Sequence, residues 1–370
     1  MVAASKHLIS ADDEWSPLRS VIVGRAEHSA FPYEAAHMIA ATMPHEHASE
    51  FRPFNAFPEE VITRAQWELD NFASLLERQG IRVCRPRKID WLKVGGYTGA
   101  MPRDGLMTVG NALIEAPFAW ACRRHEIQLG YSDILHELSG GGSSRIYRAP
   151  LIIGPDTLYD GVDVKAVAAY HGRADNLEGV QNGNGHGVNP GWAINNSRPA
   201  FDAADFMRFG KTVIGQLSNV TNCKGVQYLQ AVVPEGYAVE ILDTTDEHAM
   251  HIDATILPLR DGLLVYNPER VTEEALRRHA VFRDWELHAY PFVPQPREPP
   301  SPPMYMCSSW LALNALSIDE RRIMVEENDV QFADWVRDKF GMEPIMCPFQ
   351  NVNSIGGSFH CATVDLVRSA

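Results

Sequence analysis

The feature that most constrains this chain is a structural unit that recurs along it. Each copy holds two short apolar strands around a tight turn, then an amphipathic helix, then one more strand, and there are about five copies. The clearest copy covers residues 251–291, where Asp261-Gly262 predicts a hairpin turn and Thr272 a helix N-cap. Because self-similarity of this kind seldom arises by chance, it favours a ring of equivalent modules.

Three further copies follow the same order. Their expected hairpins cover 105–117, 202–216 and 308–326, their expected helices 119–138, 222–233 and 329–340, and their expected returning strands 148–154, 237–243 and 343–349. Turn-forming residues stand in the middle of the hairpins, at Gly110-Asn111, Gly210 and Asp319. These segments predict repeated ββαβ modules.

The fifth copy is divided between the two ends of the chain. Near the N-terminus, the pattern predicts a strand at 20–24, a helix at 58–78 and a strand at 81–86. This copy lacks one strand, which segment 357–368 supplies. Pairing of the two ends closes the ring and removes the exposed sheet edges. We therefore predict an α/β fold, a five-bladed pseudosymmetric α/β propeller of ββαβ units that forms one domain over residues 1–370. The alternative is two or three ordinary α+β domains with similar hairpins.

Composition narrows the class of protein. The chain has 33 Lys and Arg against 47 Asp and Glu, a net charge of −14, and such a surface repels the phosphates of nucleic acids. No apolar run reaches the roughly 18 residues of a membrane span, and the first twenty residues resemble neither a secretory signal nor a transit peptide. The six cysteines show no CxxC pair, which argues against a disulfide framework or zinc ribbon and favours the cytoplasm.

Three segments lie outside the repeated unit. The polar segment 179–191 and the proline-rich segment 291–303 predict surface excursions. Segment 29–57 predicts a covering loop. Its His45-Glu46-His47 resembles a metal cluster only superficially, because adjacent side chains point in different directions.

Polar residues stand at the start of the first strand of each module. They are Arg103 and Asp104, Asp202 and Asp205, His251 and Asp253, Ser308, and Cys361. In a closed ring these positions face one axis. A cysteine can act there as nucleophile, a histidine as general acid and base, and carboxylates can orient the histidine or bind a cation. Buried carboxylates need a positive partner, and a planar guanidinium with five donors fits that need.

Four segments carry a resemblance to a known family: MPRDGLMTVGNALIEAPFAW, FDAADFMRFG, MHIDATILPLRDGLLVYNPER and NVNSIGGSFHCATVDLVR. The chain resembles the L-arginine:glycine amidinotransferase family and its relatives that act on inosamine phosphates, lysine and toxin precursors. The resemblance extends from Glu14-Trp15 to the C-terminus. It implies the pentein fold, a five-bladed α/β propeller.

The resemblance also implies roles for individual residues. The catalytic cysteine, histidine and aspartate fall on Cys361, His251 and Asp202, the guanidinium-binding carboxylates on Asp104 and Asp253, and the arginine that binds the substrate carboxylate on Arg270. Further candidates for substrate binding are Arg103, Met250, Asp205 and Ser308. For Asp205 a hairpin cap is an equal alternative, for Ser308 a structural hydrogen bond, and without the resemblance Arg270 is a surface loop charge.

The implied reaction is ping-pong transfer of an amidino group. Cys361 attacks the guanidinium carbon of L-arginine, His251 protonates ornithine as it leaves, and an amine then takes the amidino group from the cysteine. Neither a metal nor an organic cofactor is needed, and a homodimer is a candidate assembly. Glycine is the default acceptor, but Cys307-Ser308-Ser309 and segment 246–249 differ from the glycine-using relatives and leave the acceptor open. The alternatives are a guanidino hydrolase of the same fold and a catalytically silent guanidine-binding protein.

Overall fold

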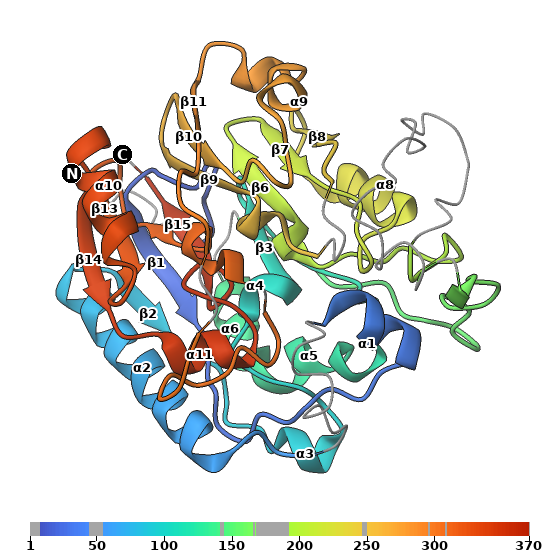
Figure 1. Cartoon of the computed structure of the whole chain (residues 1–370). Coiled ribbons are helices and arrows are strands. Elements are labelled where there is room, and N and C mark those ends of the chain that lie inside the picture. The colour runs from blue at the N-terminus through green and yellow to red at the C-terminus, as the bar shows by residue number, and fades with distance from the viewer. Residues whose placement is uncertain are drawn as a thin grey trace.

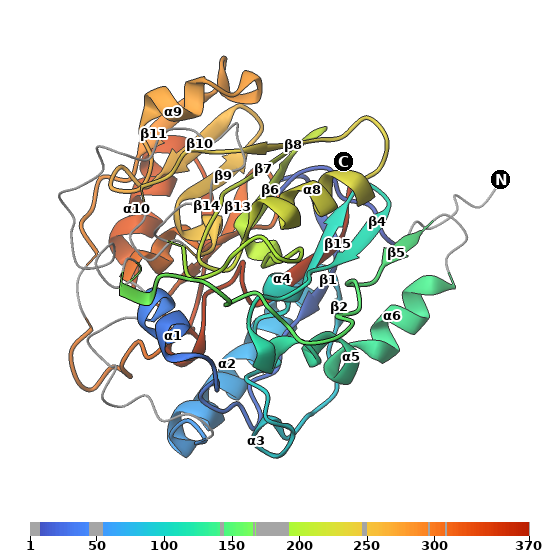
Figure 2. The ribbon, with the colours of Figure 1, turned by 90° about the vertical axis from the view of Figure 1, so that its right-hand side faces the viewer.

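A computed structural model describes residues 8–43, 55–140, 144–165, 167, 192–245, 250–294, 297–307 and 309–369. Within these residues, fifteen strands form five separate three-stranded sheets. Figures 1 and 2 show the sheets arranged around a common centre, with helices α2, α8, α9 and α10 on the outside and α4 near the middle.

All five sheets have the same topology. The middle strand pairs antiparallel with one neighbour and parallel with the other, as a hairpin followed by a helical crossover requires. The sheets are β15(Thr363–Arg368)-β1(Leu18–Val23)-β2(Arg82–Cys84), β3(Leu106–Val109)-β4(Ala112–Glu115)-β5(Arg145–Tyr147), β6(Phe206–Phe209)-β7(Thr212–Gly215)-β8(Ala238–Ile241), β9(Ile256–Arg260)-β10(Leu263–Tyr266)-β11(Glu286–Ala289) and β12(Leu316–Ser317)-β13(Arg322–Glu326)-β14(Glu343–Cys347). The prediction of five ββαβ modules is confirmed.

The crossover helices lie between the second and third strands. They are α2 (Glu59–Arg78), α5 (Glu126–Gly130) with α6 (Ser132–Ser139), α8 (Cys223–Val232), α9 (Glu273–Arg277) and α10 (Val330–Phe340). The long helix α2 buries Val61, Ala65, Leu69, Phe72 and Leu76, spaced three or four residues apart, so that one apolar stripe faces the core. Helices α1 (Ala36–Thr42), α3 (Trp91–Val94) and α11 (Gln350–Ile355) lie outside this pattern. Among the described helices, none is long and apolar enough to cross a membrane.

The two ends of the described chain share one sheet. Strand β15 pairs antiparallel with β1, where Ile22 is opposite Val364, and β1 pairs parallel with β2. Ile22 and Val364 are fully buried in one cluster. The first and last strands therefore complete the same module, as the split fifth copy predicts.

The module of β3–β5 differs from its prediction in two places. The single helix expected over 119–138 is divided into a 3₁₀ turn (Ala121–Arg123), α5 and α6. The returning strand expected over 148–154 is instead β5, Arg145–Tyr147. Pro150 has no backbone N–H to donate to a ladder, and the apolar Leu151 and Ile153 beyond it are exposed.

A short helical turn precedes the first strand of four modules. These turns are α4 (Pro102–Gly105) and the 3₁₀ turns η3 (Ala203–Asp205), η4 (Ile252–Ala254) and η6 (Ser309–Leu313). They contact one another in order, α4 with η3, η3 with η4, and η4 with η6. The start of each first strand is therefore brought to the centre of the ring.

Candidate active site

Residues from four modules meet at this centre. Asp104 lies on α4, Asp202 directly before η3, His251 directly before η4, and Cys361 in the turn that leads into β15. One side-chain atom from each of Asp104, His251 and Cys361 lies within 4.8 Å of the other two. All four side chains are almost fully buried.

His251 is held by three carboxyl groups. Its Nε2 lies 3.1 Å from Oδ2 of Asp202, and its Nδ1 lies 3.8 Å from Oδ1 of Asp104. Its backbone N–H donates to Oδ1 of Asp205 at 2.8 Å, and its φ of 69° is strained for a residue with a side chain. Burial alone lowers the pKa of His251, but Asp104 and Asp202 outweigh it and raise that pKa to about 10. The ring is therefore an imidazolium at neutral pH.

Asp205 supports this arrangement from behind. Its Oδ1 accepts from the backbone of His251 and from Nε2 of Gln216 at 2.9 Å, and its Oδ2 accepts from the hydroxyls of Ser218 and Thr221. Both of its oxygens are thus occupied by protein donors. Asp205 positions the backbone of His251.

Cys361 lies between a donor and an acceptor. Nδ2 of Asn314 donates to its Sγ at 3.1 Å, and its thiol donates to Oδ2 of Asp253 at 3.2 Å. Burial raises the pKa of Cys361 well above its ordinary value, and the charges of Asp253 and Asp104 raise it further. A Cβ on Gly357 would come within 2.7 Å of Sγ, so only glycine fits beside the sulfur.

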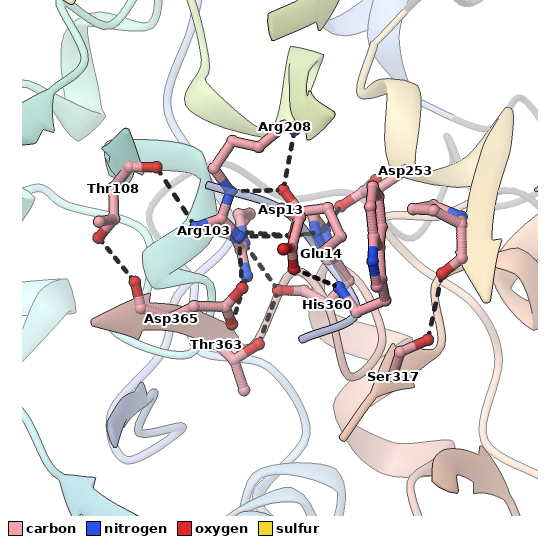
Figure 3. Close-up of polar contacts among 12 residues, drawn as sticks. Asp13, Glu14, Arg103, Thr108, Arg208, Asp253, Ser317, His360, Thr363 and Asp365 are labelled. Carbon is pink, nitrogen blue, oxygen red and sulfur yellow. Dashed lines mark hydrogen bonds and ion pairs between the residues drawn. The ribbon is translucent and has the colours of Figure 1, made fainter. Parts of the chain in front are cut away.

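Asp253 also contacts the residue before the cysteine. Its Oδ2 lies 2.8 Å from Nδ1 of His360, whose Nε2 lies 3.4 Å from Oε2 of Glu14 (Figure 3). Burial raises the pKa of Asp253, but the hydrogen bond and charge of His360 outweigh it and the net shift is downward. Asp253 is therefore ionised beside the thiol.

A buried ion network lies next to His360 (Figure 3). The guanidinium of Arg208 donates two hydrogen bonds to Glu14, at 2.8 and 2.6 Å, and one to Asp365. Asp365 also pairs with Arg103 at 3.1 Å and Arg368 at 2.8 Å. Each carboxylate is paired, which buried charges require. The network joins the N-terminal segment, α4, β6 and β15.

Arg123 is a site residue that sequence analysis did not identify. Its Nη1 lies 2.7 Å from Oδ2 of Asp104 and 3.6 Å from Oδ2 of Asp202, and its Nη2 lies 2.9 Å from Glu126. Burial raises the pKa of Glu126 to about 7 despite this partner. Arg123 thus supplies positive charge to the carboxylate cluster. Neither a motif nor a helical periodicity marks it.

Three carboxylates at this centre have one oxygen that accepts no hydrogen bond from the described residues: Oδ1 of Asp104, of Asp202 and of Asp253. Two of these residues, Asp104 and Asp202, line a pocket together with Met43, Tyr97, Trp120, Arg123, Met250, His251, Met306 and Gly356. One part of its wall is acidic and another is made of methionine and aromatic side chains.

The other predicted site residues have different positions. Met250 lines the pocket. The guanidinium of Arg103 instead donates to Asp365 and to the backbone carbonyl of His360. The backbone N–H of Arg103 donates to the carbonyl of Cys361. Arg270 is buried and hydrogen-bonds through its backbone to Thr245 and Asn267. Ser308 lies outside the described residues, as do His45-Glu46-His47 and segments 179–191 and 246–249. Substrate binding by Arg103, Arg270 and Ser308 stays a prediction.

His251 and Asp253 lie ahead of the strand on whose start they were expected. Strand β9 begins at Ile256, whereas His251 precedes η4 and Asp253 lies within it. The 3₁₀ turn, together with the positive φ of His251, still directs the two residues to the same centre.

The three converging atoms of Asp104, His251 and Cys361 also have a spacing that a metal ion could bridge. Metal ligation needs a neutral imidazole and a thiolate. The pKa of His251 is raised to about 10 and that of Cys361 well above its ordinary value, so both are protonated at neutral pH. A metal ion at these residues would therefore have to displace both protons.

The fold and the site together define a five-module α/β propeller with a buried Cys–His–Asp group at its centre. The sequence is 38% identical over 370 residues to the L-arginine:L-lysine amidinotransferase of Pseudomonas savastanoi pv. phaseolicola, covering 96% of this chain and 93% of the relative. It is 32% identical to the mitochondrial glycine amidinotransferase of Danio rerio, covering 97% of this chain and 83% of the relative. No protein-family model matches.

A solved structure agrees with these sequence relatives. The amidinotransferase of the saxitoxin biosynthetic pathway from Microseira wollei superimposes with a TM-score of 0.79 at 29% identity, over 98% of both chains. The chain belongs to the amidinotransferase family of transferases and has its pentein fold. The resemblance seen in the four sequence segments is confirmed.

Proposed function

We propose that this protein transfers the amidino group of L-arginine through an amidino-Cys361 intermediate to a primary amine, with ornithine and a guanidino compound as products. The observation that carries the proposal is that, among the described residues, one oxygen on each of Asp104, Asp202 and Asp253 accepts no hydrogen bond, while Asp104 and Asp253 lie near the sulfur of Cys361. Buried acceptors without donors are costly. A guanidinium brings five N–H donors and a positive charge, and so satisfies them together.

The geometry supports a role for each group in the first half-reaction. Asp104 and Asp253 hold the guanidinium flat with its central carbon near the sulfur. The thiol of Cys361 loses its proton, the S–C bond forms and the C–N bond to ornithine breaks. His251 donates a proton to the departing nitrogen and is restored by the proton that the thiol released. The raised pKa of His251 suits it to act first as an acid.

The second half-reaction reverses these roles. An amine enters the place that ornithine left and attacks the amidino carbon. The N–C bond forms, the C–S bond breaks, and the proton of the amine passes through His251 to the sulfur, which regenerates the thiol. Asp202, 3.1 Å from Nε2 of His251, holds the ring in place through both steps.

The pocket wall supports substrates with a hydrocarbon chain. Met43, Met250, Met306 and Trp120 line the same pocket as the charged residues and offer apolar contact to the methylene groups of arginine. The same wall favours an amine acceptor with methylene groups, such as lysine, over glycine.

The homodimer and the cytoplasmic location remain predictions.

The test combines intact mass with an acceptor panel. Arginine alone is expected to leave a stoichiometric amidino adduct, which is absent from Cys361→Ala and is discharged by an added amine with release of ornithine. Glycine, lysine, aminobutyrate, amino sugars and buffer alone are compared. Sustained citrulline production without an amine would instead identify a hydrolase, and arginine binding without adduct or ornithine would identify a silent binding protein.

A further inference from the structure

We propose that Asn314 is a catalytic residue whose side-chain amide stabilises the thiolate of Cys361. Nδ2 of Asn314 lies 3.1 Å from Sγ and donates to it. The side chain is buried, and the residue directly follows η6, two residues before β12 begins. This inference rests on the proposed role of Cys361 as nucleophile and adds a group that touches the reacting sulfur.

Two backbone donors determine the orientation of this amide. Oδ1 of Asn314 accepts from the backbone N–H of Ser358 and from that of Cys361, both at 3.1 Å. The carbonyl oxygen must face these donors, because a rotated amide would place N–H groups against N–H groups. The NH₂ group therefore faces the sulfur. The same residue shapes the turn of the nucleophile and donates to its reacting atom.

The two neighbours of the sulfur favour opposite protonation states. Asp253 accepts from the sulfur at 3.2 Å and so favours the thiol, whereas an N–H donor favours the thiolate. Once the positive charge of arginine lies on Asp253, the carboxylate no longer opposes ionisation of the thiol. Asn314 then remains as a donor to the sulfur. It acts when the thiolate forms and again when the sulfur departs in the second half-reaction.

The place of Asn314 in the ring agrees with this role. In two other modules an aspartate near the sulfur stands two or three residues before the first strand: Asp104 before β3 and Asp253 before β9. Asn314 stands two residues before β12. Around the sulfur, this module contributes a neutral donor where those two contribute carboxylates.

The first test is the rate at which iodoacetamide alkylates Cys361 at a fixed pH, followed on its peptide by mass spectrometry. Asn314→Asp keeps the acceptor oxygen for the two backbone donors but has no N–H for the sulfur. Because a hydrogen bond to a charged group shifts an ionisation by about one to two pH units, we expect alkylation to slow by about 10- to 100-fold. Asn314→Ser, which adds no charge, is expected to slow it by about 10-fold. Arginine-dependent turnover should fall by similar factors.

The matched control is Asn71→Asp. Asn71 donates to the sulfur of another buried cysteine, Cys347, at 3.7 Å. This variant should leave the alkylation of Cys361 unchanged, with folding of all variants checked by circular dichroism.

An unchanged rate in Asn314→Ser overturns the proposal even if Asn314→Asp is slow, because the added charge would then explain the effect. Asn314→Ser also decides the question if Asn314→Asp does not fold. Alkylation does not depend on amidino transfer. Turnover that survives Cys361→Ala would therefore refute the proposed function, while the alkylation rates would still report on Asn314.

Discussion

The thiol of Cys361 donates a hydrogen bond to Oδ2 of Asp253 at 3.2 Å. The same Oδ2 lies 2.8 Å from Nδ1 of His360, and Oδ1 of Asp253 accepts no hydrogen bond from the described residues. Without a cation, this geometry holds the sulfur as a thiol. In the proposed reaction, the positive charge of the bound guanidinium removes that restraint, so Cys361 becomes reactive where arginine binds.

Asp253→Asn is expected to make Cys361 more reactive and the enzyme less active. Loss of the carboxylate charge lowers the pKa of the thiol, and each unit of pKa raises the thiolate fraction about tenfold at neutral pH. Alkylation by iodoacetamide at pH 7.5 should accelerate by about 10-fold, while turnover with arginine is lost. Alkylation of Cys347 serves as an internal control. Slower alkylation of Cys361 in Asp253→Asn would contradict the conclusion that Asp253 holds the sulfur as a thiol.

Asp202→Asn should move the pH dependence of arginine turnover. Asp202 is among the carboxylates that raise the pKa of His251 to about 10, so its neutralisation lowers that pKa. The alkaline limb of kcat/KM, where His251 loses its proton, should shift to lower pH by about one unit or more. A profile of kcat/KM from pH 6 to pH 11 checks this. The idea fails if the limb stays in place.

The same pKa predicts how the stability of the substrate-free protein depends on pH. The pKa of His251 lies above its ordinary value of 6.5, so the stabilisation is fully present below pH 6.5 and is lost as the pH rises through about 10. The difference in Tm between wild type and His251→Gln should therefore shrink from pH 6.5 to pH 10.5 in thermal unfolding. A difference that grows with pH would have the wrong sign.

Arg123→Met is expected to destabilise the fold by about 3–5 kcal/mol, because it leaves Asp104 and Glu126 as buried carboxylates without their cation. Arg64→Met is the control, since Arg64 pairs with Glu60 on the exposed face of α2 and should cost no more than about 0.5 kcal/mol. Urea unfolding at pH 7 measures both. Equal losses of unfolding free energy in Arg123→Met and Arg64→Met would show that Arg123 does not neutralise the carboxylate cluster.

Ile22→Ala tests whether residues 1–370 form one domain. Ile22 is fully buried in β1, opposite Val364 of β15, and its truncation should cost about 2–5 kcal/mol. If the ring is one cooperative unit, tryptophan fluorescence and far-UV circular dichroism should report one transition, shifted as a whole. Two transitions, only one of them shifted, would indicate separate domains.

The local sequence pattern was enough to predict the five ββαβ modules. Turn residues such as Gly262, the caps at Asn222 and Thr272, and the apolar stripe of α2 act over a few residues and can be recognised from sequence. The strand expected over 148–154 was wrong because an apolar run was given more weight than Pro150, which cannot donate to a ladder. Motif segments likewise pointed to Cys361, His251 and the aspartates around them.

Sequence pattern thus predicted the repeated module, the pairing of the two ends in one module, and the residue types of the proposed nucleophile, acid and cation-binding carboxylates. Only the tertiary structure selected Arg123, Asn314 and His360, and it alone set the directions in which the pKa values of His251 and Cys361 move. The physical reason is distance along the chain: Asn314 and Cys361 are 47 residues apart, and Asp202 and His251 are 49 apart. Burial and charge at such contacts depend on how whole modules pack, which no local pattern records.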